Sequence, residues 1–64
     1  MTLREAHLRA SVYQCSIRVR WSKRSTKQYA AQHARWDRDK FRRNAVWRDD
    51  IEDAVLDCGR IKQG

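Results

Sequence analysis

One stretch of this sequence, residues 12–21, restricts the fold more than any other because apolar and polar residues alternate along it. Its odd positions from Tyr13 to Trp21 are apolar and its even positions from Gln14 to Arg20 are polar, which is the period of a strand with one buried face. A lone strand leaves backbone donors and acceptors unpaired along both edges. No other segment alternates in this way, so we expect the second strand to come from another chain.

The rest of the chain has the periodicity of helices. Tyr29, His33 and Trp36 recur at helical intervals. They follow a Ser-x-x-Gln capping box that begins at Ser25. This pattern predicts a helix over residues 26–38.

A second helix is predicted over residues 44–58. Trp47, Ile51 and Val55 lie there on one apolar stripe. Gly59 follows as the expected C-terminal stop.

These elements make the predicted fold class α+β and mostly helical, with one N-terminal strand over residues 12–21 followed by two helices. The 64 residues form a single small domain, in which residues 1–11 are a short helical arm and residues 60–64 a frayed tail. A chain of this length buries only about 60% of the surface that its extended form exposes, so it is marginal as a monomer. We therefore expect an intertwined homodimer held by an intermolecular antiparallel ribbon.

The charge of the chain is positive and unevenly distributed. Residues 1–48 carry thirteen Lys and Arg against three acids, a balance of +10, and residues 49–64 carry two against five, a balance of −3, in agreement with the net charge of +7. Such a body favours a polyanionic partner, of which the phosphate backbone is the commonest. A basic protein without a nucleic-acid role is the alternative that charge alone leaves open.

The polar face of the strand supplies the candidate nucleic-acid contacts. A two-stranded ribbon fits the major groove of DNA, where Arg reads guanine and Gln or Ser can meet other base edges. A merely solvated strand face is the alternative. The predicted nucleic-acid-binding residues are Gln14, Ser16, Arg18, Arg20, Lys23, Arg24 and Asn44.

The apolar positions supply a predicted interface. Trp21 lies in a basic setting, where its ring could stack on a base, but its parity with the other odd positions predicts that it points inward. Aromatic residues of this kind would carry most of the binding energy of an interface. The predicted interface residues are Tyr13, Ile17, Val19, Trp21, Trp36, Trp47, Ile51 and Val55.

The alternating run Ser16–Trp21 and the segment Asn44–Ile61, which ends in Gly-Arg-Ile, resemble parts of the ribbon-helix-helix repressors of the Arc and MetJ type. The resemblance implies a dimer whose strands form the ribbon. It also implies that backbone amides near Asn44 hold a phosphate at a helix N-terminus. The side chains that it places in the major groove are Ser16, Arg18 and Arg20.

No arrangement typical of an enzyme, a metal site or a cofactor site occurs in the sequence. There is no glycine-rich phosphate loop, nucleophile elbow or local pair of metal ligands, so we expect no catalysis, metal or cofactor. No apolar run reaches the length of a membrane span, and the N-terminus lacks the apolar core of a signal peptide. We expect a cytoplasmic protein that does not enter the membrane, with Cys15 and Cys58 as reduced thiols. A disulfide that ties the strand to the end of the last helix is the alternative.

Two main functions are consistent with these features. The first is a small nucleic-acid-binding regulator, a transcriptional repressor that binds double-stranded DNA as a homodimer through its ribbon. The second is a small inhibitor or adaptor, of the kind that phages and mobile elements encode, which adds its strand to a sheet of a host protein and matches an acidic surface there. A peptide that folds on RNA or the ribosome is a third.

Overall fold

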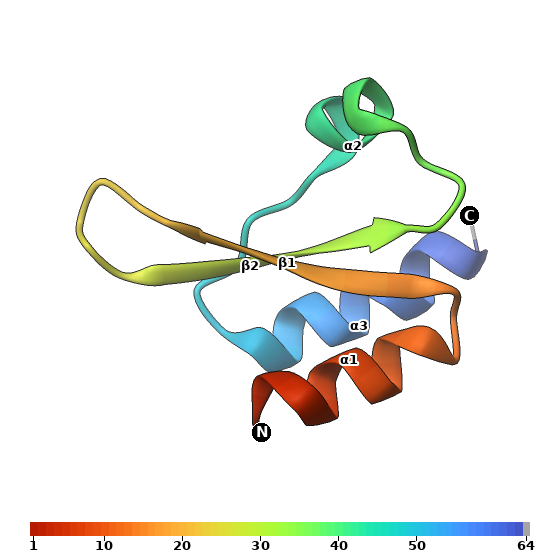
Figure 1. The fold of residues 1–64 in the computed structure, drawn as a ribbon, viewed down its shortest axis with the longest axis horizontal. Helices are drawn as coiled ribbons and strands as arrows, with labels where there is room; N and C mark the ends of the chain where they lie inside the picture. Colours follow the sequence, from red (N-terminus) through yellow and green to blue (C-terminus); the bar gives the residue numbers. More distant parts are fainter. Residues whose placement is uncertain (64) are drawn as a thin grey trace.

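The computed structural model describes residues 1–63, with side chains described through Ile61, and arranges them in three layers (Figure 1). A two-stranded antiparallel hairpin forms the middle layer. Helices α1 and α3 lie side by side on one of its faces, and the short helix α2 lies on the other (Figure 1). The predicted order of one strand followed by two helices is therefore wrong. The elements are α1 (Leu3–Ser11), β1 (Cys15–Trp21), β2 (Lys27–His33), α2 (Arg38–Asn44) and α3 (Ile51–Gln63).

The partner of β1 is β2 of the same chain, not a strand of a second copy. The register pairs Trp21 with Lys27 across the loop Ser22–Thr26, in which the backbone N–H of Ser22 donates to the carbonyl oxygen of Thr26 at 2.8 Å. Ser25 turns the chain with a φ of 62°, in the left-handed region. The expected intermolecular ribbon and intertwined homodimer are thus corrected, because a short loop brings a second strand to β1 within one chain.

Residues 27–33 form a strand although their spacing predicts a helix over 26–38. The neighbours Ala30 and Ala31 are both buried, which a strand achieves by pointing them to opposite faces. Their small side chains let a helical layer approach each face. Pairing with β1 outweighs the helix propensity of Ala, Gln and Lys, because propensity is weak compared with tertiary contacts.

The core lies between the hairpin and the helix pair α1 and α3. The first of these helices begins at Thr2, whose hydroxyl accepts a hydrogen bond from the backbone N–H of Glu5 at 3.2 Å, as the Thr-x-x-Glu spacing predicts. Small side chains dominate the core and let the helices lie close to the strands. Its buried members are Ala6, Ala10, Cys15, Ile17, Ala31, Ala54 and Cys58.

The last helix differs from its predicted span at both ends. It begins at Ile51 rather than at residue 44, and it continues through Gly59 to Gln63. Gly59 is therefore not a helix stop. It packs against the ring of Tyr13, whose Cζ lies 3.6 Å from the place where a Cβ would stand. Of the predicted frayed tail at 60–64, residue 64 lies outside the described residues.

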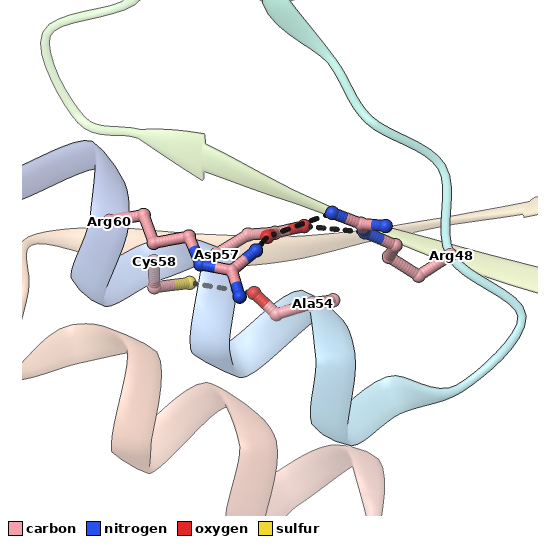
Figure 2. A network of polar contacts seen from close by, with 5 residues as sticks. All are labelled: Arg48, Ala54, Asp57, Cys58 and Arg60. Carbon is pink, nitrogen blue, oxygen red and sulfur yellow. Dashed lines mark hydrogen bonds and ion pairs between the residues drawn. The ribbon is translucent and has the colours of Figure 1, made fainter.

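The segment between α2 and α3 is fixed to both β2 and α3 through Arg48. Its backbone exchanges two hydrogen bonds, of 2.7 and 2.8 Å, with Tyr29 on the outer edge of β2. Its guanidinium donates to both carboxylate oxygens of the buried Asp57, at 2.9 and 3.2 Å, and Arg60 donates to the same carboxylate at 3.1 Å (Figure 2). The hydrogen bond and charge of Asp57 raise the pKa of Arg48. These three residues hold the chain together and are not a free charged surface.

Candidate nucleic-acid interface

The side of the hairpin that faces α2 carries the even-numbered residues of β1. Directly opposed residues of an antiparallel pair point to the same face, so the register groups six even-numbered residues there. The odd positions, among them Cys15 and Ile17, point to the core. The alternation of β1 therefore separates a polar face from a core face. The six residues of the polar face are Ser16, Arg18, Arg20, Gln28, Ala30 and Gln32.

Four arginines converge on a hollow between β1 and α2, which we call the arginine hollow. Arg18 and Arg20 come from β1, and Arg38 and Arg42 come from α2, where the i, i+4 spacing puts them on one side of the helix. The hollow has a volume of about 590 Å³. The described residues that line it include no carboxylate. Its lining is completed by Phe41, Ala45 and Trp47.

Arg20 is held in the arginine hollow by two contacts. Its guanidinium carbon lies 4.2 Å from the centroid of the Trp47 ring, and its Nε donates to Oε1 of Gln28 at 3.0 Å. Gln28 in turn donates to Asp49 at 3.1 Å. The terminal nitrogens of Arg20 make no hydrogen bond to any described residue, so they are available to an anion.

Arg18, Arg38 and Arg42 have no carboxylate partner in the described part of the chain, where the ion pairs are those of Asp57. All three side chains are exposed. Like charges repel one another, and an anion that binds between them relieves the repulsion. A guanidinium can donate two parallel hydrogen bonds to a phosphate. The arginine hollow can therefore hold phosphate groups.

Helix α2 is placed over the hairpin by a cap and by aromatic packing. The carboxylate of Asp37 accepts a hydrogen bond from the backbone N–H of Lys40 at 2.7 Å. Phe41 packs edge to face on Trp47, with ring centroids 6.0 Å apart. No residue of α2 is buried, and so short a helix is unstable without such contacts. Trp47 therefore joins α2 to β1, because it contacts both Phe41 and Arg20.

Comparison with known proteins does not assign this chain to a family. No protein-family model matches the chain, and no curated protein or solved structure matches it significantly. The order on which the resemblance to ribbon-helix-helix repressors depends, a strand followed by two helices, is not the observed order. None of the helices within residues 1–63 has the length and apolar character needed to cross a membrane.

The structure brings together some of the predicted nucleic-acid-binding residues. Ser16, Arg18 and Arg20 share the polar face of β1. Lys23 and Arg24 lie in the hairpin loop and line a second hollow of about 600 Å³, which we call the tip hollow. The basic contacts are thus divided between the arginine hollow and the tip hollow.

Three predicted contacts line neither hollow, namely Ser16 on the polar face of β1, Gln14 and Asn44. Gln14 precedes β1 with a φ of 59°, and its carbonyl oxygen accepts a hydrogen bond from the backbone N–H of Ala34 at 2.8 Å. Asn44 is the last residue of α2, and its side chain donates to the carbonyl oxygen of Lys40 at 2.8 Å. The phosphate site expected at a helix N-terminus near Asn44 is therefore corrected, because α3 begins only at Ile51.

The predicted interface residues also have different positions. Ile17 is buried in the core of its own chain, and Trp47 lines the arginine hollow. Trp36 lies half-buried after β2. Val19 and Trp21 share the core face of β1 but are 41% and 66% exposed, so the expectation that Trp21 enters the core is not met. Three others pack against the core, namely Tyr13, Ile51 and Val55.

Sequence reasoning missed Arg38, Phe41 and Arg42 as site residues. The i, i+4 spacing of the two arginines puts them on one side of a helix, which is the signal that the sequence offers. Because the spacing predicts a helix over 26–38, it does not bring Arg42 near β1. Nothing local to this segment indicates that α2 folds back over the hairpin.

Proposed function

We propose that this protein binds nucleic acid and that the arginine hollow holds its phosphate backbone. The convergence of Arg18, Arg20, Arg38 and Arg42 carries the proposal, because the described lining of their hollow has no carboxylate. The arginines come from a strand and from a helix that are separated by the whole of β2. The cluster of arginines is therefore formed by the tertiary structure and not by one basic segment of the sequence.

The placement of the acidic residues supports the same function. Glu52 and Asp53 lie in the first turn of α3, and this helix covers the hairpin face opposite to α2 (Figure 1). Asp57 of the same helix is neutralised by Arg48 and Arg60. Asp37 and Asp39 lie at the start of α2 itself, but neither lines the arginine hollow. A polyanion is thus attracted to the hollow, and such a field orients an approaching nucleic acid.

The proposed role is that of a small regulator that acts by binding nucleic acid. This role does not require a ribbon built from strands of two chains. Helix α2 lies over the polar face of β1 (Figure 1), so the arginine hollow meets chiefly phosphates, which position a complex without reading its sequence. The free thiols of Cys15 and Cys58 support a reducing compartment. The cytoplasm is the compartment that we assign to this role.

The salt dependence of binding tests the proposal, with two double variants that lose the same charge. Arg18→Ala with Arg42→Ala removes two arginines of the hollow, whereas Arg4→Ala with Arg9→Ala removes two exposed arginines of α1. The first pair should weaken binding to a labelled oligonucleotide roughly ten- to hundredfold. It should also reduce the slope of log affinity against log salt by about 2.

The control pair should change both quantities much less. Equal losses in the two double variants would indicate diffuse attraction and not a site. Native binding that is indifferent to salt would contradict the proposal altogether.

A second candidate is binding to a host protein by strand addition, which the open edge of β1 favours. Tyr29 pairs its backbone with Arg48, so its N–H and C=O point away from β1. Val19 lies directly opposite Tyr29, and its own backbone groups therefore point away from β2. In the described chain no strand pairs with this side of β1. An extended segment of an acidic partner could pair there.

Val19→Pro separates this candidate from the first. The substitution removes the backbone N–H of residue 19. Because this N–H points away from β2, no hydrogen bond to β2 is lost. Strand addition is favoured if Val19→Pro no longer binds a protein that the native chain binds, and if the native chain binds no nucleic acid.

A further inference from the structure

The side chains on the core face of β1 are buried at the start of the strand and exposed near the hairpin loop. Cys15 and Ile17 are 7% and 3% exposed, whereas Val19 is 41% and Trp21 is 66% exposed. The reason is visible in the fold, where the loop end of the hairpin extends past α1 and α3 (Figure 1). The large aromatic ring of Trp21 is thus exposed to solvent near the hairpin loop and is not part of the hydrophobic core.

The surroundings of Trp21 are cationic. Lys27 lies directly opposite in the register, and its Nζ is 5.6 Å from the centroid of the Trp21 ring. Lys23 and Arg24 line the adjacent tip hollow together with Lys27. Asp49 is the one carboxylate in the described lining of the tip hollow, and it accepts a hydrogen bond from Gln28.

The loop that carries these cations has an internal hydrogen-bond network. The hydroxyl groups of Ser22 and Thr26 are 2.8 Å apart. The Ser22 hydroxyl also accepts from the backbone N–H of Arg24 at 3.2 Å and of Thr26 at 3.3 Å. The network fixes the backbone of the loop, so Lys23 and Arg24 project from set positions close to Trp21 before any ligand binds.

We propose that Trp21 stacks on an unpaired nucleobase, while Lys23, Arg24 and Lys27 hold the adjoining phosphates. This inference rests on the proposed nucleic-acid function and specifies its ligand as a single strand or a segment with unpaired nucleotides. An exposed indole accepts any base face, and basic grooves with aromatic platforms are typical of single-strand recognition. In a duplex the base faces are already stacked on one another, so they are not accessible to the ring of Trp21.

An anionic membrane surface and an acidic peptide are the other ligands that a tryptophan among cations can meet. The hairpin tip favours nucleic acid because it combines an exposed indole with three cations, one of which, Lys27, lies over a face of the ring, and a nucleotide presents a flat base together with a phosphate. The arginine hollow on the other face of the same strand gives a longer chain further phosphate contacts.

The test compares a labelled single-stranded oligonucleotide with a blunt duplex of equal phosphate number, by fluorescence anisotropy on the full chain. Trp21→Ala should weaken single-strand binding roughly 5- to 150-fold and leave duplex binding within about twofold. Trp21→Phe should retain most of the single-strand affinity, because it keeps an aromatic face. Leu56→Ala, which removes a side chain of similar exposure (60%) from α3, is the matched control and should change neither.

The outcomes distinguish this inference from the proposed function. Native single-strand affinity in Trp21→Ala, with loss in the Arg18 and Arg42 double variant, would overturn the stacking role and leave nucleic-acid binding intact. An absence of binding to both oligonucleotides in the native chain would overturn both. Binding to vesicles of phosphatidylcholine and phosphatidylserine that depends on Trp21, without a preference for the single strand, would assign the tip to a membrane and overturn the inference as well.

Discussion

The two faces of the hairpin are made by the same two strands and differ in every other respect. Away from the hairpin loop, the face toward α1 and α3 is closed by apolar side chains such as Ala31 and Ile17. The face toward α2 is open and carries Arg18 and Arg20 beside the arginines of α2. Because side chains alternate along a strand, neighbours in the sequence belong to opposite layers. A short chain can in this way build a core and a binding face from one element.

The two faces also differ in whether their charged side chains form ion pairs. On the helix-pair side the carboxylate of Asp57 is buried and contacts Arg48 and Arg60 (Figure 2). On the α2 side Arg18, Arg38 and Arg42 have no carboxylate partner in the described chain. Charges that stabilise the fold are thus paired, and charges that are available to a ligand are unpaired. Three experiments test the difference between the core side and the binding side of the hairpin.

The largest effect should come from adjacent residues on opposite faces. Ile17→Ala removes a buried side chain and should lower the free energy of unfolding by about 2–5 kcal/mol, which approaches the whole stability of a small domain. Arg18→Ala should change it by less than about 0.5 kcal/mol. Urea unfolding followed by circular dichroism measures both. Equal losses of stability would break the distinction between a structural face and a binding face.

The second effect concerns the buried carboxylate. Asp57→Ala leaves the guanidinium groups of Arg48 and Arg60 without their acceptor and should cost about 1–3 kcal/mol in thermal or urea unfolding. Asp53→Ala, an exposed change in the same helix, is the control and should cost little. Neither variant should weaken nucleic-acid binding, because both lie on the helix-pair side. A gain of affinity in Asp57→Ala, where the two guanidinium groups lose their carboxylate, would place Arg48 and Arg60 within reach of the bound nucleic acid instead.

The smallest effect is a dependence of stability on alkaline pH. Burial raises the pKa of Cys58 to about 12 and also raises the pKa of Cys15. The folded chain keeps a proton that the unfolded chain releases near the ordinary thiol value of 9.0, so the contribution is complete below that value and is lost as pH rises toward 12. For one thiol the loss is about 1.4 kcal/mol between about pH 8 and about pH 10.

Urea midpoints at about pH 8 and about pH 10 measure this dependence. Cys58→Ala should show a shallower decline between the two pH values than the native chain, because the thiol is gone while the other titrating groups remain. An identical decline would show that Cys58 does not stay protonated in the folded core.

Part of the fold and part of the site are readable from particular residues. The alternation from Cys15 to Trp21 identifies β1 and separates Arg18 from Ile17. The Thr2 cap identifies the start of α1, and the stripe that includes Ile51 and Val55 identifies the body of α3. Each of these signals is local, because it depends on the period of one element or on a side chain that caps its own helix.

The rest depended on contacts that no local pattern records. Lys27–His33 has residues that suit a helix, and it became a strand because the edge of β1 lies one short loop away. Gly59 suits a helix end, yet it lies inside α3 where the ring of Tyr13 packs over it. Trp21 has core parity but extends past the helices, which begin and end elsewhere. The arginines of α2 joined those of β1 only because Phe41 and Trp47 hold the short helix over the hairpin.

The sequence by itself determined the period and polarity of β1, the excess of positive charge and its concentration before residue 49. Tertiary structure alone decided which strand pairs with β1, where the chain turns, and which cations meet. The physical reason is one of energy scale. Propensities and caps amount to about 1 kcal/mol or less per residue, whereas pairing a strand edge and burying a face involve many groups at once.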